Sequence, residues 1–184
     1  MVLYVNFVKK ILRNIFFHER IRDDLMEVEN AVIKMVSLHN AKEFTPQQEA
    51  DVQCLLFHLI LQQGIRVPCI HAGFPIRYYE KWIHPDIVIG DPNNIGECDI
   101  IEIKFMQKDW DSQPGRITRR METSKKDLKR LSEIEGKHKF FIFFNEARPL
   151  SYTRKKRLLE SAGKKVTLIF LEKKDGILIS EIYP

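Results

Sequence analysis

The chain has 184 residues, of which 44% are hydrophobic and 30% charged, and its net charge is +5. This is the length and composition of one soluble domain with a hydrophobic core, and no apolar run reaches the roughly 20 residues that a membrane-spanning helix needs. The small positive excess is compatible with a polyanionic partner but does not identify one.

Cysteine usage indicates the compartment. The three cysteines, Cys54, Cys69 and Cys98, are an odd number without Cys-x-x-Cys spacing, which argues against a disulfide framework and a zinc site. Positive charges interrupt the partly apolar residues 2–17, and no small-residue cleavage site follows, so this segment is read as a helix rather than a signal peptide. We therefore expect a cytoplasmic protein.

The N-terminal part is predicted to be helical. Apolar residues recur at steps of three and four within residues 3–40, which predicts two helices there. We expect residues 1–44 to form a helical extension packed on a core of residues 45–184, within a single domain. The next helix is predicted to begin with Thr45 as its N-cap and to end near Gln63, before a glycine.

Strands and helices then alternate. Residues 67–79 contain two short strand-like pieces, and residues 85–90 form the next strand. A turn at residues 91–94 leads into a strand over residues 98–106. A basic linker follows, and the remaining predicted elements are helix 124–135, strand 138–145, helix 152–162, strand 166–173 and edge strand 177–182. This order predicts an α/β fold with a mixed central sheet flanked by helices.

The strand over residues 98–106 has an unusual face. Side chains alternate along a strand, so Ile101 and Ile103 point one way while Glu102 and Lys104 point the other. Burying charge in so apolar a strand is costly unless the charged groups are paired or bind a metal. The pattern therefore indicates a chemical role for this pair.

A metal site follows from the neighbouring strand. Asp86 lies on the preceding strand, and two acids on neighbouring strands can converge on one cation. The backbone carbonyl of Ile103 is a third possible ligand. Such hard oxygen ligands favour Mg²⁺, with Mn²⁺ as a substitute, over zinc. Lys104 could then orient or deprotonate an attacking water, and Glu49, near the start of a helix, is an auxiliary ligand.

These residues resemble the PD-(D/E)XK nuclease superfamily, which has the restriction-endonuclease-like fold. The resemblance rests on Pro85-Asp86 and on Glu102-Ile103-Lys104, and it covers about residues 45–172. It implies an αβββαβ core, metal binding by Asp86 and Glu102, assistance to the water by Lys104, and a helix acid at Glu49. Glu43 and Asp51 are rivals of Glu49 for the last role.

A basic cluster follows the proposed catalytic strand and could bind phosphates beside the scissile bond. The residues chosen as DNA-binding are Arg116, Arg119, Arg120, Lys125, Lys126 and Lys129, with Arg130 next to them. A solvated helix face explains the same cluster about equally well. The predicted function is a Mg²⁺-dependent endonuclease acting on duplex or branched DNA, and a homodimer would allow both strands to be cut.

Three alternatives stay open. The acids and the lysine could be solvated cross-strand partners without catalytic function. The protein could bind DNA with the same fold and not cleave it, in which case its binding is salt-sensitive and no product forms with any metal. It could also be an RNA nuclease, which a comparison of substrates with and without the 2′-hydroxyl separates.

Overall fold

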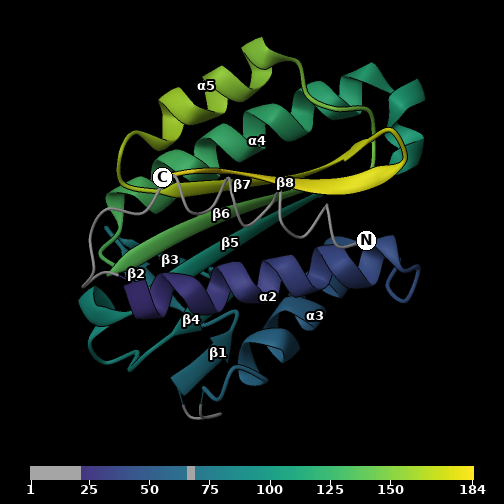
Figure 1. The fold of residues 1–184 in the computed structure, drawn as a ribbon. Coiled ribbons are helices and arrows are strands. Elements are labelled where there is room, and N and C mark those ends of the chain that lie inside the picture. The colour runs from purple at the N-terminus through teal and green to yellow at the C-terminus, as the bar shows by residue number, and fades with distance from the viewer. Residues whose placement is uncertain (1–21, 66–68) are drawn as a thin grey trace.

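The secondary-structure elements form three layers around a mixed sheet (Figure 1). The computed structural model describes residues 22–65 and 69–184. Helices α2 (Arg22–Asn40) and α3 (Glu49–Leu61) cover one face of the sheet, and α4 (Pro114–Glu133) and α5 (Tyr152–Ala162) cover the other. Among the described residues, none of these helices has the length and apolarity needed to cross a bilayer.

The main sheet has six strands in the order β1-β4-β5-β6-β7-β8. The strands are β1 (Ile70–Ala72), β4 (Ile87–Ile89), β5 (Asp99–Met106), β6 (His138–Asn145), β7 (Thr167–Lys174) and β8 (Ile177–Tyr183). The β5–β6 and β6–β7 pairs are parallel, while β1–β4, β4–β5 and β7–β8 are antiparallel. Parallel neighbours need a crossover connection, which α4 and α5 provide. The predicted α/β fold with a mixed sheet is confirmed at this level.

Four short elements lie outside the main sheet. Strands β2 (Ile76–Tyr78) and β3 (Lys81–Ile83) pair only with each other, as an antiparallel hairpin between β1 and β4. Two 3₁₀ helices, η2 (Ile95–Glu97) and η3 (Lys108–Ser112), lie on either side of β5. The two predicted strand pieces within residues 67–79 are β1 and β2, whereas β3 was not predicted.

Each face of the sheet has its own hydrophobic core. The aromatic run of β6 divides between them by alternation, with Phe140 and Phe144 on the α2/α3 side and Phe141 and Phe143 on the α4/α5 side. All of these rings are fully buried. Because β6 lies between two parallel neighbours, both of its faces must be apolar, which explains its nearly continuous hydrophobic sequence.

Helix α2 belongs to the predicted N-terminal extension, and it packs on the core. Val28, Val32 and Met35 are buried in the α2/α3-side cluster at helical spacing, as predicted. At its end, the Asn40 side chain donates to the carbonyl of Leu178 (2.9 Å) and accepts from its N–H (2.8 Å), which ties α2 to β8. The first of the two predicted helices lies outside the described residues.

The predicted start of α3 was wrong. The N-cap is Gln48, not Thr45, and the helix begins at Glu49. The Asp51 carboxylate accepts hydrogen bonds from the N–H groups of Gln47 (2.8 Å) and Gln48 (3.1 Å). These N–H groups precede the first helical residue, so the acid at the third helical position fixes the helix start instead of the threonine.

The predicted basic linker after β5 was also wrong. Instead of beginning near Ser124, α4 begins at Pro114, which occupies the first turn, where its missing N–H costs nothing. Ile117 and Met121 are buried in line with Leu128 further along the helix. Arginines and threonines between these apolar positions obscured the helical period in the sequence.

Candidate active site

Strand β5 carries both charged residues of the sequence motif on one buried face. Ile101 and Ile103 pack in the α2/α3-side core, while Met106 packs on the α4/α5 side. Glu102 and Lys104 are only 8% and 7% exposed, and both contact residues of α4. The alternation predicted from the sequence is confirmed, so two charges do lie within the core-forming part of the sheet.

Acidic side chains complete the edge of β5 beyond its pairing with β4. β4 pairs with β5 only as far as Ile101. Beyond that point, the N–H of Ile103 donates to Asp86 Oδ2 (2.6 Å) and the N–H of Phe105 donates to Glu49 Oε2 (3.0 Å). A buried N–H must find an acceptor, and here two carboxylates replace a strand. Asp86 and Glu49, which were predicted from separate parts of the sequence, therefore bond to the same edge of β5.

Lys104 lies at the centre of the charged groups. Its Nζ is 2.6 Å from Glu102 Oε1, 3.3 Å from Asp127 Oδ2 and 3.8 Å from Glu49 Oε1. An ammonium surrounded by three carboxylates in a buried position is held in place without a metal. The structure thus brings together the predicted residues Glu49, Glu102 and Lys104, and it adds Asp127.

Helix α4 supplies Asp127, which the sequence analysis missed, and two arginines that it had assigned to DNA binding. Arg130 Nη2 lies 2.8 Å from Asp127 Oδ1 and 3.9 Å from Glu102 Oε1. Arg120 contacts the Glu49 carboxylate and donates to the carbonyl of Phe105 from Nε (3.2 Å) and Nη2 (3.1 Å). Positions 120, 127 and 130 share one side of a helix, a signal that would have been visible had the helix been predicted to begin at residue 114.

Burial controls the ionisation of the acids. Burial, and then the charge of Glu102, raise the pKa of Asp86 to about 7. Burial also raises the pKa of Glu102, against the pull of Lys104. Burial alone would lower the pKa of Lys104, but Glu102 and Glu49 outweigh it, so its pKa is raised and it stays an ammonium at neutral pH.

Asp86 and Glu102 suit a divalent cation. Glu102 is buried and Asp86 is half-buried. Burial and then the negative charge of Glu102 raise the pKa of Asp86, and a nearby cation would counteract both effects. The carbonyl of Ile103 points to the same strand edge as its N–H, because both groups of a strand residue face one neighbour. Glu49 fits less directly, since its carboxylate is already bonded to Arg120 and to the N–H of Phe105.

Within residues 22–65 and 69–184, no three acidic, histidine or cysteine side chains are gathered in the arrangement of a preformed metal site. Each carboxylate is turned toward a protein donor instead. Asp86 faces the N–H of Ile103, and Glu102 faces Lys104. Metal binding here would therefore exchange these donors for the cation.

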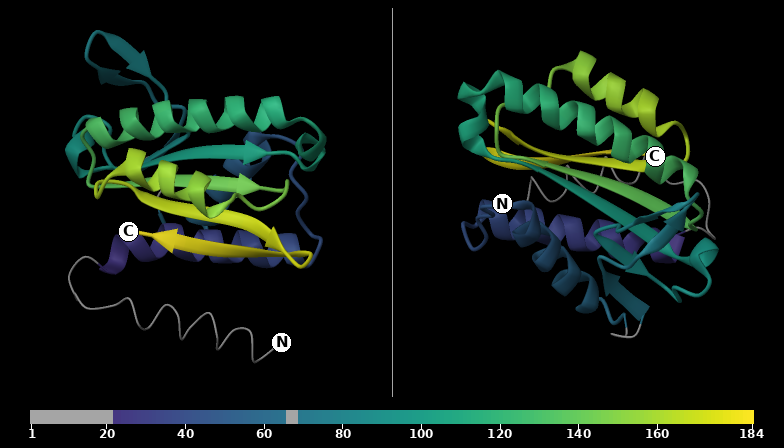
Figure 2. Two further views of the ribbon diagram at one scale, coloured as in Figure 1. Left: turned by 90° about the horizontal axis from the view of Figure 1, so that it is seen from above. Right: turned by 180° about the vertical axis from the view of Figure 1, so that it is seen from behind.

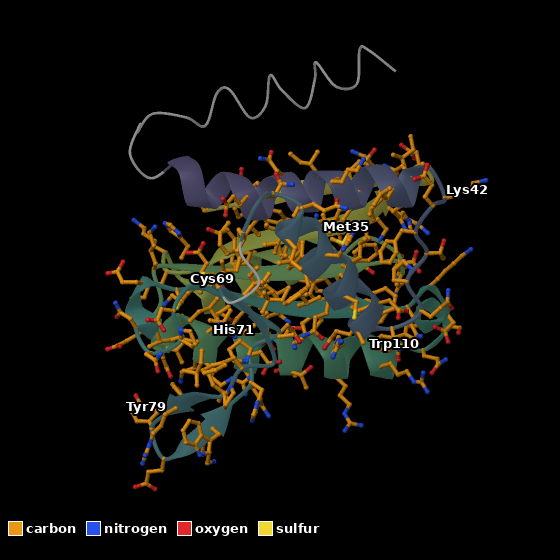
Figure 3. All side chains as sticks on the ribbon, turned by 90° about the horizontal axis from the view of Figure 1, so that it is seen from below. Met35, Lys42, Cys69, His71, Tyr79 and Trp110 are labelled. Atoms are coloured by element: carbon orange, nitrogen blue, oxygen red, sulfur yellow. The ribbon has the colours of Figure 1, made fainter. Side chains whose placement is uncertain are left out.

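A shallow hollow opens beside Glu102. The side chains around it are Ile83, Pro85, Glu102, Asp127, Arg130, Leu131 and Ile134. It lies between the base of the β2–β3 hairpin and α4, so Glu102 and Asp127 are approached from this side. Figure 3 shows the hairpin on one side of the molecule, with Tyr79 at its far end.

The predicted DNA-binding residues separate into two groups on α4. Arg116, Arg119, Lys126 and Lys129 are exposed. Lys125 is half-buried and bonded to Glu122 (2.6 Å), and Arg120 is held by Glu49. Positions 116, 119, 126 and 130 form a row along the helix that runs next to the row facing β5. A strip of positive charge therefore borders the acidic cluster.

Comparison of the sequence with models of known protein families and with curated proteins yields no match. What this region does must therefore be inferred from its own geometry and chemistry.

Proposed function

We propose that this protein is a metal-dependent endonuclease of the PD-(D/E)XK superfamily that hydrolyses phosphodiester bonds in duplex or branched DNA. The observation that carries the proposal is that Asp86 accepts from the N–H of Ile103, between the bonded pair Glu102 and Lys104, and that Glu102 lines a hollow. The order α3, β1, β4, β5, α4, β6 supports it, because it follows the αβββαβ succession of the restriction-endonuclease-like fold once the β2–β3 hairpin is set aside.

In this proposal Asp86, Glu102 and the carbonyl of Ile103 hold Mg²⁺ or Mn²⁺, with Glu49 as an auxiliary ligand. The bound cation would neutralise the carboxylates and polarise a phosphoryl oxygen. Without such a cation, Asp86 and the three acids around Lys104 would repel a phosphodiester.

In this proposal, Lys104 acts on the attacking water and on the phosphate. Its raised pKa keeps it protonated, so it donates hydrogen bonds and does not remove a proton itself. It can hold the attacking water in line with the phosphorus and stabilise negative charge that develops on the phosphate. Arg130, which lies beside both Glu102 and Asp127, is placed to contact a second phosphate oxygen.

The test is a panel of supercoiled, linear, branched and single-stranded DNA and a matched RNA, each incubated with Mg²⁺, Mn²⁺ or chelator. We expect nicking or cleavage of DNA with either metal and no product with chelator. Asp86→Asn should abolish cleavage, whereas Lys164→Ala, an exposed lysine between α5 and β7, should cleave like the wild type. Metal-independent product, or undiminished product from Asp86→Asn, would rule out the proposed site. Cleavage of the RNA in place of the DNA would change the substrate class.

One observation favours a second candidate, a DNA-binding protein that does not cleave. All the acids of the cluster already have protein donors, as they would in a purely structural ion network. That candidate predicts salt-dependent DNA binding through the α4 strip and no product in any arm of the panel. Isothermal titration of the wild type and Asp86→Asn with Mn²⁺ separates the two, because only the nuclease needs a site that loses the metal when Asp86 changes.

Cleavage of both strands of a duplex would be simplest for a homodimer, in which each protomer cuts one strand. Light scattering of the full chain with and without DNA measures this directly. A monomer that only nicks supercoiled DNA would favour action on one strand at a time.

A further inference from the structure

The β2–β3 hairpin projects from the body of the protein. It is inserted between β1 and β4 and pairs with neither. Figure 2 shows it standing away from the layers of sheet and helices, and Figure 3 shows Tyr79 at its tip. The six-stranded sheet is complete without it.

The base of the hairpin is anchored. Ile76 and Ile83 lie opposite each other and are both buried. Tyr78 packs against the α4/α5-side core, and its hydroxyl is hydrogen-bonded to Glu133 at the end of α4. An isolated two-stranded hairpin is barely stable in water, so these contacts are what hold its tip in a defined position.

The tip exposes aromatic rings next to positive charge. Tyr79 is 78% exposed and Trp82 is 63% exposed. Arg77 lies directly opposite Trp82 on the outer face, and Lys81 is also exposed, against a single acid, Glu80. Aromatic rings with adjacent cations suit a nucleobase and its phosphate, because every base has a flat face for stacking and every linkage is negative.

The backbone of Tyr79 is unfavourable for stability. Its φ is 52°, in the left-handed region that a two-residue hairpin loop requires. Asparagine or glycine adopts this conformation readily, whereas a bulky side chain is rare there. The Tyr79 ring packs edge-on against Tyr78, with ring centroids 4.7 Å apart, yet the residue remains 78% exposed. Most of the ring is therefore open to a binding partner outside the molecule.

The hairpin is continuous with the candidate active site. Ile83 and Pro85 line the hollow together with Glu102, and Asp86 follows directly. Arg130 lies on the opposite side of that hollow, at the end of the basic strip of α4. A strand of DNA that follows the strip toward Glu102 would leave the site along the hairpin.

We propose that the hairpin tip, formed by Arg77, Tyr79 and Trp82, binds unstacked bases of a single-stranded segment, so that the enzyme selects DNA in which a duplex meets a single strand. This inference rests on the proposed nuclease function for its biological meaning, but the binding itself does not require cleavage. Rings of this kind stack on the bases of single strands, while the bases of an intact duplex are hidden.

The test uses fluorescence of the full chain carrying Trp110→Phe, because Trp82 and Trp110 are the chain's two tryptophans. With chelator present, the protein is titrated with oligothymidylate, with a fork bearing a thymine arm, and with a blunt duplex of the same sequence. Anisotropy of labelled DNA measures binding in parallel. We expect Trp82 fluorescence to be quenched by the oligothymidylate and by the fork, and little changed by the duplex.

Variants extend the test. Trp82→Ala and Tyr79→Ala should each weaken fork binding roughly tenfold, with little change for the duplex, and Trp82→Phe should restore most of the affinity. Tyr152→Ala is the matched control, since Tyr152 is 81% exposed but lies on α5. It should bind like the wild type, and thermal melts should show all four variants folded.

The outcomes separate this inference from the proposed function. Unquenched Trp82 on a bound fork, or unchanged fork affinity in Trp82→Ala, overturns the hairpin proposal even if metal-dependent cleavage is found. Quenching with no cleavage in any metal leaves the hairpin proposal standing and overturns the nuclease. Absence of binding to every oligonucleotide overturns both.

Discussion

Two buried ion clusters in this protein use the same residue types in different ways. In the β5 cluster, Lys104 Nζ lies 2.6 Å from Glu102, and in the β7–β8 cluster, Lys155 Nζ lies 2.6 Å from Glu172 and 2.8 Å from Glu181. Both lysines have raised pKa values, because neighbouring carboxylates outweigh the effect of burial.

The acids of the two clusters differ. Glu172 is bonded by the side chain of Asn145 (3.0 Å) and by the N–H of Leu150 (2.7 Å), as well as by Lys155. For Glu181, burial acts to raise the pKa, but hydrogen bonds from Lys155 and Tyr183 hold it below its ordinary value. The charges of this cluster are matched by directed donors, as expected of a structural network.

In the β5 cluster, by contrast, the effect of burial on the acids outweighs the effect of the hydrogen bonds that they accept. Burial raises the pKa of both Asp86 and Glu102, and Asp86 reaches about 7. Strongly raised acid pKa values of this kind are typical of candidate functional sites. The comparison teaches that a buried lysine and glutamate do not by themselves mark an active site. What makes the β5 cluster a candidate is that its two acids have raised pKa values despite the donors that they contact.

The largest expected difference is in activity. Lys104→Met should lower metal-dependent cleavage by a factor of about 10² to 10³, the usual contribution of a donor that stabilises developing charge. Lys155→Met should leave the rate per folded molecule within about threefold of wild type, since removing a structural ion pair affects folding and not the chemical step. Single-turnover rates, normalised to folded protein by circular dichroism, check both. Equal losses in the two variants would erase the distinction between the clusters.

The second difference is in stability. Lys155→Met leaves Glu172 buried without its counter-charge, and we expect the free energy of unfolding to fall by about 3 kcal/mol. Lys156→Met is the matched control, because the neighbouring Lys156 side chain is 60% exposed and its partner Glu160 is 4.0 Å away. It should change stability by less than about 0.5 kcal/mol. Urea denaturation measures both, and a mild effect of Lys155→Met would contradict the structural role of its cluster.

A change of opposite sign is expected at Asp86. Between its ordinary pKa of 3.8 and its folded pKa of about 7, the folded chain holds a proton that the unfolded chain has lost. The free energy of unfolding therefore decreases as pH rises through this range. The stability that the proton on Asp86 contributes is fully present below pH 3.8. Asp86→Asn removes the effect, so with chelator present it should be more stable than wild type at pH 8, by up to about 4 kcal/mol.

Urea denaturation across pH tests this expectation. The stability advantage of Asp86→Asn should shrink as pH falls from 8 toward 4. Mn²⁺ binding to the wild type should weaken over the same range, because protons compete with the metal for Asp86. A variant that is less stable than wild type at pH 8 would show that the Asp86 carboxylate serves the fold.

The smallest expected effect concerns the basic strip. Arg119→Ala and Lys126→Ala should each reduce the dependence of DNA affinity on salt, by about one unit of slope in a plot of log affinity against log salt concentration, without changing sequence preference. Lys164→Ala should leave the slope unchanged. Anisotropy titrations at several salt concentrations measure it. Unaltered slopes for Arg119→Ala and Lys126→Ala would favour the alternative considered from the sequence, that the α4 strip is only a solvated helix face.

Local patterns were enough to predict part of the site. The alternation in β5 placed Glu102 and Lys104 on one face, and the apolar runs of β5 and β6 identified buried strands. The error at Thr45 was local as well, because the capping acid lay at Asp51, three residues beyond the cap. The prediction of a basic linker was wrong for a different reason. The apolar face of α4 becomes evident only against the core that it covers.

The sequence by itself determined which residues of β5 are buried and that a carboxylate and an amine share one of its faces, because side-chain direction along a strand is set by backbone geometry alone. Only the tertiary structure decided that the pairing of β4 with β5 stops at Ile101 and that Asp86 and Glu49 then satisfy the open edge. It also decided that Asp127 pairs with Lys104 and Arg130 with Asp127. It also decided that the hairpin stands outside the sheet. These outcomes depend on where strands end and how helices pack, which are set by contacts between segments far apart in the chain.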